Sequence, residues 1–209
     1  VAAPRFELYE YEDTNARWDP CSGPIRVKVN PNGHMTNDRL QEWETHLLSV
    51  TSELSDITGL PLVYAGVTST ALRNTAPDGR TATDILFYVM PPGPIGDPVY
   101  TSLSEYHFGT PGEWFVDSLG GVGGWMEILS YDIAISTLHV NDESPWWKLN
   151  LMHYLGIALG LNLLPEADSV DTELMGWVGW GSGTYGNPAW GPGDLIGLRL
   201  VGANNGCFN

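Results

Sequence analysis

Apolar residues recur at helical spacing between Thr36 and Thr58. They make one side of the segment hydrophobic while the other side stays polar, and they fall at Leu40, Trp43, Leu47, Val50 and Leu54. Gly59 follows directly, at the position where glycine commonly ends a helix. The pattern therefore predicts an amphipathic helix over residues 36–58.

A second helical segment is apolar on nearly every side. It lies within Pro145 to Leu164, which reads PWWKLNLMHYLGIALGLNLL. Proline suits the first position of a helix and Gly160 is placed to end one, so we predict a helix over residues 145–159. Because a helix without a polar face is buried, we expect this one at the centre of the fold, next to any site that the fold carries.

Strand patterns separate these helices. Alternating or β-rich runs lie at Ile25–Asn30, Leu62–Tyr64, Ile85–Met90 and, as one or two strands, Trp125–Thr137. Residues 1–20 predict an N-terminal arm or an edge strand. Residues 91–124 predict long irregular loops with one short strand, and the Gly- and Trp-rich residues 175–193 predict irregular structure. With a short terminal helix over Asp194–Val201, the order of elements indicates an α+β fold.

Composition and charge limit the classes of function. A chain of 209 residues with 43% hydrophobic residues suits a single sizeable domain over 1–209. The formal net charge of −16 makes nucleic acids and anionic membrane surfaces poor partners. No segment has the length and clean apolar character of a membrane span, so membrane insertion is not expected. The acidic residues are interpreted as a solvated surface, with structural calcium as the alternative.

Two features of the chain ends favour an exported protein. The sequence begins Val-Ala-Ala-Pro, as expected of a mature chain after removal of an export signal, although a trimmed chain would look the same. Its two cysteines, Cys21 and Cys207, lie near opposite ends and predict one disulfide; two unrelated buried thiols are the alternative. We therefore expect a secreted, extracellular protein.

Several motifs resemble the secreted matrixin-like metallopeptidases of bacteria, within the metzincin clan. They are the central helix together with Arg-Trp-Asp-Pro-Cys at 17–21, the strand at 25–30, Thr-Gly-Leu at 58–60, Glu-Leu-Met at 173–175 and Gly-Pro-Gly-Asp-Leu-Ile-Gly-Leu at 191–198. The resemblance implies one matrixin-like domain with a small twisted mixed sheet. It also implies the zinc motif H-E-x-x-H-x-x-G-x-x-H with a later Met-turn, in which three histidines bind zinc and the glutamate is the general base.

The motif keeps its spacing in this chain but loses its chemistry. His153 holds the first ligand position, Gly160 the bend and Met175 the Met-turn. Tyr154 stands at the base position, whereas Ile157 and Leu163 stand at the other two ligand positions. Aliphatic side chains offer no lone pair to a metal, and a phenol with a pKa near 10 is a poor base at neutral pH. We therefore expect neither zinc binding at this position nor peptide hydrolysis by the family's mechanism.

His153 is accordingly interpreted as a core histidine held by one or two hydrogen bonds. Ile157 and Leu163 are predicted to fill the former metal position as an apolar plug, and Met175 to act in packing. The remaining histidines (His34, His46, His107 and His139) lack ligand spacing and are predicted at the surface or in loops. A displaced zinc site built from His107, His139 and His153 is the alternative that sequence leaves open.

These observations lead to two hypotheses of different class. The first is a catalytically inactive, exported pseudopeptidase that serves as an extracellular binding or structural module, with a protein partner or a second copy of itself. The second is an active metal-dependent peptidase with an atypical zinc site that includes His153. The tryptophans of the Gly-rich loops suit protein contacts as well as core packing.

Overall fold

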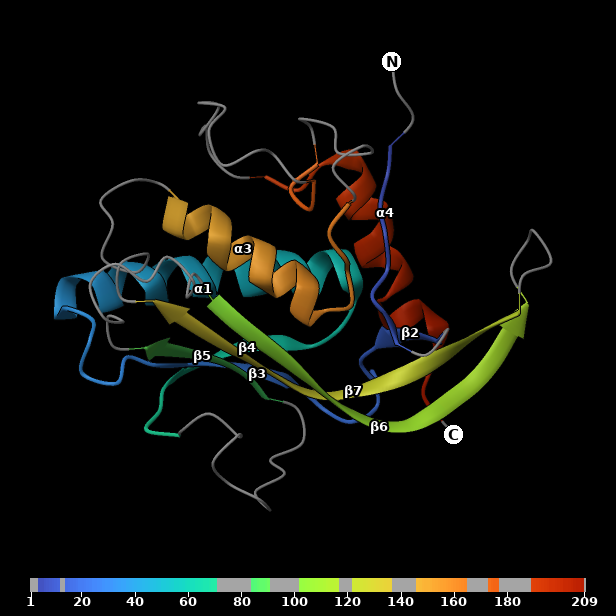
Figure 1. Ribbon diagram of the computed structural model, residues 1–209, viewed down its shortest axis with the longest axis horizontal. Coiled ribbons are helices and arrows are strands. Elements are labelled where there is room, and N and C mark those ends of the chain that lie inside the picture. Colours follow the sequence, from blue (N-terminus) through green and yellow to red (C-terminus); the bar gives the residue numbers. More distant parts are fainter. Residues whose placement is uncertain are drawn as a thin grey trace.

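The computed structural model describes residues 4–11, 14–70, 84–90, 102–116, 122–136, 146–164, 173–176 and 189–208. Two helices, α1 (Asn37–Thr58) and α3 (Trp146–Ala158), lie on one face of a twisted β-sheet (Figure 1). A third helix, α4 (Pro192–Leu200), lies beside the N-terminal segment. The chain thus mixes helix and sheet, as the α+β prediction requires.

Seven strands form one mixed sheet. They are β1 (Glu10–Tyr11), β2 (Thr14–Arg17), β3 (Ile25–Asn30), β4 (Leu62–Val67), β5 (Asp84–Met90), β6 (Ser102–Val116) and β7 (Val122–Ser136). The order is β1-β2-β7-β5-β3-β4, with β6 also paired to β7. The β2–β7, β7–β5, β5–β3 and β3–β4 pairs are parallel, whereas β1–β2 and β6–β7 are antiparallel.

Strand β7 joins the two parts of the sheet. Its residues 125–127 pair with β2 and its residues 130–136 pair with β5, while β6 pairs with it from Val122 to Ile135. Since a strand has only two edges, β2 and β5 follow one another along the edge that β6 does not occupy. The β6–β7 hairpin therefore extends past β5 to the N-terminal strands (Figure 1).

The length of β6 corrects one prediction. Residues 91–124 were expected to form irregular loops with a short strand, but β6 runs from Ser102 to Val116 and β7 begins at Val122. The register of β6 shifts on both sides of Pro111, where the ladder is irregular. Pairing with β7 thus overrides the local turn signals. The predicted strand or strands at 125–137 belong to the single strand β7.

Helix α1 agrees with its predicted bounds. Thr36 is its N-cap, and the hydroxyl accepts a hydrogen bond from the Arg39 N–H; Gly59 ends the helix with φ 71°. Helix α4 begins at Pro192 and ends at Leu200, close to the predicted 194–201. The hydrophobic spacing and Gly59 therefore located α1, and the predicted terminal helix is present as α4.

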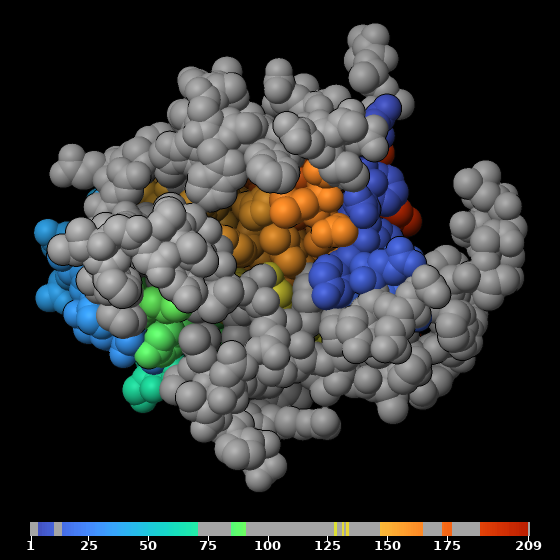
Figure 2. Space-filling model, viewed as in Figure 1, coloured from blue at the N-terminus to red at the C-terminus, as the bar shows by residue number. Residues whose placement is uncertain are grey.

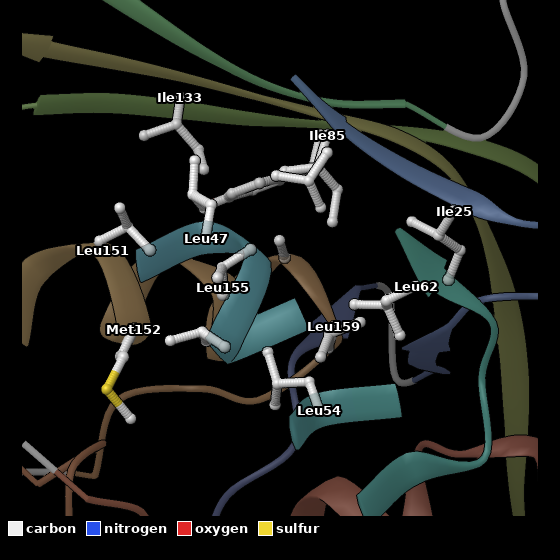
Figure 3. Close-up of a cluster of buried hydrophobic side chains, with 14 of the residues drawn as sticks. Ile25, Leu47, Leu54, Leu62, Ile85, Ile133, Leu151, Met152, Leu155 and Leu159 are labelled. Atoms are coloured by element: carbon white, nitrogen blue, oxygen red, sulfur yellow. The ribbon is translucent and has the colours of Figure 1, made fainter. Parts of the chain in front are cut away.

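The core fills the space between the helices and the sheet (Figure 3). Leu47 and Leu54 of α1 and Leu151, Leu155 and Leu159 of the α3 segment are fully buried. They face buried aliphatic side chains of the sheet, among them Ile25, Ile85 and Ile133. Each such side chain contributes about 1.5–3 kcal/mol by leaving water. The predicted burial of α3 is therefore correct, and this burial explains why nearly every side of the helix is apolar.

Helix α3 ends in a Schellman motif around Gly160. The Leu161 N–H donates to the Gly156 carbonyl at 3.1 Å, and the Gly160 N–H donates to the Ile157 carbonyl at 2.8 Å. Gly160 has φ 107°, and a Cβ atom there would lie 2.4 Å from the Ala16 carbonyl oxygen. Glycine is thus required both by the backbone conformation and by the close approach of β2.

The N-terminal segment binds the end of α3. The Tyr9 N–H donates to the Gly160 carbonyl at 2.8 Å, and the Asn162 N–H donates to the Glu7 carbonyl at 2.8 Å. The buried Trp18 indole N–H donates to the Ala158 carbonyl at 2.7 Å. The predicted arm and the predicted edge strand are therefore both present, because residues 7–9 lie along 160–162 while Glu10–Tyr11 forms β1 at the edge of the sheet.

Two further features bear on the predicted location of the protein. Cys21 and Cys207 form a disulfide across 186 residues, with their Cα atoms 5.5 Å apart, as predicted. Among the helices of the described ranges, none combines the length and the apolar character needed to cross a bilayer.

Replacing Gly160 by alanine should lower the free energy of unfolding by at least about 2 kcal/mol in urea titrations. The left-handed conformation alone penalises alanine by about 1–2 kcal/mol, and the new Cβ would also press on the Ala16 carbonyl oxygen. Gly23→Ala is the matched control, because Gly23 has φ 95° but nothing within 4 Å of its Cβ position. Equal losses in the two variants would show that the contact with Ala16 contributes nothing.

Candidate functional site

The candidate site lies on the face of α3 that turns toward residues 173–176. His153, Gly156 and Ile157 share this face because they are three or four residues apart in the helix. The segment Glu173–Gly176 packs against this face, and the Leu164 N–H donates to the Met175 carbonyl at 3.0 Å. The site therefore joins the middle of α3, the residues after its bend and the segment of the predicted Met-turn.

His153 links α3 to this segment. Its partly buried imidazole lies edge-on to the Tyr154 ring, with centroids 5.7 Å apart, and forms a hydrogen bond with the backbone of Leu174. Burial lowers the pKa of His153 from its usual value, and the bond to Leu174 opposes this shift only in part. The imidazole is therefore neutral at physiological pH.

Met175 packs directly against α3. It is buried, and a Cβ atom at Gly156 would lie 2.8 Å from the Met175 Sδ atom and 3.2 Å from the Trp190 ring. Gly156 thus leaves the room that both side chains occupy. Sequence reasoning gave Gly156 no role, because a glycine inside a helix signals close packing only once its neighbour is known.

Two buried carboxylates hold the Met175 segment against α4. Glu173 accepts the N–H groups of Gly193 at 2.7 Å and Asp194 at 3.1 Å, in the first turn of α4. Asp194 in turn accepts the N–H groups of Met175 at 3.1 Å, Gly191 at 2.9 Å and Leu174. Each carboxylate therefore satisfies backbone donors of the other's segment, and together they fix Leu174 and Met175 under α3.

The two carboxylates carry like charges and repel each other. Glu173 is 2% exposed and Asp194 is fully buried. Burial raises the pKa of Asp194 and the nearby charge of Glu173 adds to this, whereas the hydrogen bonds from Gly191, Leu174 and Met175 lower it. The positive end of the α4 dipole also favours anions here. The sequence offered one signal for the pair, an acidic residue at the third position of a helix that begins Pro-Gly-Asp.

The aliphatic and phenolic replacements differ in their surroundings. Tyr154 and Ile157 are partly buried and pack against the core. Burial raises the pKa of Tyr154 to about 12, so the phenol stays protonated. Leu163 is 42% exposed, and its N–H donates to the Asn162 side chain at 2.9 Å. The predicted apolar plug is therefore wrong for Leu163, because the turn after Gly160 directs this side chain to the surface.

The other histidines do not join this face within the described residues. His46 was predicted at the surface or in a loop, but it is a partly buried residue of α1 whose ring meets Trp147 edge-on at 5.5 Å. Burial, together with the charge of Lys148, lowers the pKa of His46. His139 and the side chain of His107 lie outside the described residues, so the alternative of a displaced zinc site, which needs both, stays open.

Only one group of three potential metal ligands occurs in the described ranges. It consists of Asp19, Cys21 and Cys207, whose ligand atoms lie within 4.8 Å of one another. Its two sulfur atoms form the disulfide, and disulfide sulfur is not the thiolate that binds metals.

No model of a known protein family matches the chain, and no curated protein matches it. The likeness to the matrixin-like peptidases therefore rests on the sequence motifs quoted above.

His153→Gln should make the protein less sensitive to acid. Because the folded pKa of His153 lies below the unfolded value of about 6.5, the unfolded chain binds a proton first as the pH falls below that value. Stability is then lost toward the lower folded pKa, by up to about 1.4 kcal/mol per pH unit. Urea unfolding between neutral and mildly acidic pH measures this slope. His46→Gln should remove a separate part of the pH dependence of the unfolding free energy, because burial also lowers the pKa of His46. An unchanged slope in His153→Gln would contradict the burial of His153.

Asp194→Asn should destabilise the protein by about 1–3 kcal/mol, because an amide nitrogen would face backbone N–H donors and leave at least one unpaired. Glu173→Gln is the companion variant, measured by the same unfolding titration. The double variant should lose more than the sum of the two, since each single change already relieves the whole repulsion between the carboxylates and the double variant can relieve it only once. Additive losses would show that the two charges do not interact.

The pH dependence of Asp194 has the opposite sign to that of His153. Its folded pKa is raised, so its contribution favours the folded state at pH values below the unfolded pKa and is lost as the pH rises through the folded pKa. The Asn variant should lack this component.

Proposed function

We propose that the chain is an exported, catalytically inactive relative of the matrixin-like metallopeptidases and serves as an extracellular binding or structural module. The observation that carries this proposal is the set of residues that stand at the motif positions around His153. The surroundings of a zinc helix are kept, with a left-handed Gly160 and a buried Met175 against Gly156, while Ile157 and Leu163 supply no metal ligand.

The hydrogen bond of His153 does not by itself favour either function. Histidines that bind a metal through one ring nitrogen usually hold the other nitrogen with a backbone or carboxylate partner, and a bond to Leu174 fits that arrangement. The difference lies in the number of ligands. Zinc sites in proteins use at least three side chains, and one neutral imidazole does not retain the ion against water.

The residue at the base position also supports loss of catalysis. A general base must accept a proton near neutral pH, so its pKa should lie near 7. The pKa of Tyr154 is raised to about 12 by burial, which leaves the phenol protonated and unable to activate a water molecule. Both halves of the family's mechanism, the metal and the base, therefore lack their groups.

Binding is the function that these replacements leave available. Leu163 is an exposed leucine at a former ligand position, and the end of α3 with the residues after it reaches the surface beside the N-terminal arm (Figure 2). An exposed leucine next to the former catalytic face suits contact with a protein partner or with a second copy of the chain. The disulfide supports export, since such bonds persist in oxidising compartments.

Metal analysis of the purified protein tests the proposal against an atypical active site. The pseudopeptidase should carry well under one zinc per chain and should not cleave denatured protein substrates when zinc is added. Zinc at one ion per chain that is lost in His153→Ala would overturn the proposal and favour a metal-dependent peptidase that uses His153. Tyr154→Phe is the control, because it alters a neighbouring ring without removing a metal ligand.

Restoring the motif should restore the metal. The triple variant Tyr154→Glu, Ile157→His, Leu163→His should bind about one zinc per chain, because three histidines and a glutamate would then stand at the family's spacing around the bend at Gly160. The variant without the Leu163 change is the matched control and should bind zinc much more weakly. Equilibrium dialysis with zinc measures both, and circular dichroism checks folding. A folded triple variant that takes up no zinc would contradict the proposed family geometry.

A further inference from the structure

The disulfide lies at the surface, and polar side chains contact the residues next to each of its two cysteines. Cys21 and Cys207 are both exposed, which leaves the disulfide accessible to small solutes. The tail around Cys207 (residues 205–208) has no strand pairing within the described structure. A short 3-10 helix over Ala203–Asn205 ends at Gly206, whose N–H donates to the Ala203 carbonyl at 3.1 Å. Beyond Gly206, the position of the tail depends on the disulfide and on side-chain contacts.

Arg17 provides the first of these contacts. It is 3% exposed, and its guanidinium donates to the Gly206 carbonyl at 2.8 Å and to the Asn205 carbonyl at 3.5 Å. The same group lies over the Phe208 ring, 4.2 Å from its centroid. Arg17 thus holds the residues on both sides of Cys207, from a strand that is itself fixed to β7.

Asp19 provides the second contact, and it joins both sides of the disulfide. Its Oδ1 atom accepts the Cys21 N–H at 3.0 Å and the Phe208 N–H at 3.4 Å. Its Oδ2 atom accepts the Ser22 hydroxyl at 3.0 Å. One carboxylate therefore orients the turn that carries Cys21 and also contacts the residue after Cys207.

We propose that Arg17 and Asp19 hold the C-terminal tail in place without the disulfide, so that Cys21–Cys207 is a reversible site for exchange with small thiols. These contacts of Arg17 and Asp19, which we call the clamp, keep the two sulfur atoms adjacent after reduction and so favour re-formation of the disulfide. The partner is a low-molecular-weight thiol such as glutathione. Arg17 and Asp19 are positioning residues in this exchange.

The exchange is balanced in two steps. A thiolate attacks one sulfur of Cys21–Cys207, forms a mixed disulfide with it and releases the other cysteine as a thiolate, which takes up a proton. A second small thiol then attacks the mixed disulfide, leaving both cysteines reduced and producing one oxidised dimer of the small thiol. Closure is the reverse: the free cysteine attacks the mixed disulfide and expels the small thiol.

The clamp should strengthen closure in a measurable way. Whatever holds the tail in the reduced chain raises the effective concentration of one cysteine at the other, and so favours the closed disulfide over two mixed disulfides. Charge-assisted hydrogen bonds of the Arg17 kind contribute enough that their loss should reduce this effective concentration by about ten-fold or more. An exposed disulfide on a freely moving tail would show no such dependence.

The experiment equilibrates the folded protein in buffers of reduced and oxidised glutathione and quantifies the closed disulfide by thiol trapping and mass spectrometry. Arg17→Gln should lower the effective concentration by about ten-fold or more, and Asp19→Asn should lower it as well. Arg199→Gln is the matched control, since Arg199 is an exposed residue of α4 and the substitution removes the same charge. Equal closure in Arg17→Gln and Arg199→Gln would overturn the proposal.

A second measurement remains decisive if Arg17→Gln folds poorly. In the double variant Cys21→Ser, Cys207→Ser, the amide of Phe208 should keep a shift well away from random-coil values, because Arg17 and Asp19 still hold the tail. A Phe208 amide that shifts to random-coil values in an otherwise folded double variant would show that only the disulfide holds the tail, and the proposal would fail.

Discussion

The C-terminal end of α3 is the constraint on which the rest of the structure depends. A helix that ends inside a protein leaves carbonyl groups that must find donors. Here the turn at Gly160 satisfies two of them, and the N-terminal segment supplies donors from Tyr9 and Trp18 to others. Because α3 also carries core leucines toward the sheet, its end fixes the N-terminal segment, the bend and the residues after the bend relative to one core.

The segment Glu173–Gly176 is held by buried carboxylates as well as by the packing of Met175 against α3. Glu173 and Asp194 place Leu174 and Met175 under α3 through bonds from carboxylate oxygens to backbone N–H groups. Two carboxylates buried this closely repel each other, yet each accepts at least two N–H donors that would otherwise be unpaired. Loss of Glu173 would leave donors unpaired in the first turn of α4, and loss of Asp194 would leave donors unpaired in both segments. The pair thus holds Leu174 where His153 contacts it.

Local signals gave much of the helical structure and little of the site. Thr36 and Gly59 mark the ends of α1 because caps act over a few residues, and Gly160 marks the end of α3 for the same reason. Strand β6 was underestimated because its pairing with β7 depends on a partner that local glycine and proline signals do not reveal. Leu163 was placed in a plug because motif spacing gives position along the chain, whereas exposure depends on the direction of the turn. Glu173 and Asp194 were missed because their partners are backbone groups, and the acidic third residue of α4 was the one local signal that pointed to the pair.

Under the proposed relationship to the matrixin-like peptidases, the links that hold this region together would also explain how the fold tolerates Tyr154, Ile157 and Leu163 at the motif positions. Trp18, Gly160, Glu173 and Asp194 act through bonds to the backbone or through close packing, and none of them stands at a ligand or base position of the motif. Exchanging a histidine for Ile157 or Leu163 therefore disturbs no described contact that fixes the end of α3 or the Met175 segment. The described contacts that fix α3 therefore involve no metal ligand, so the proposed loss of the ligands leaves them unchanged.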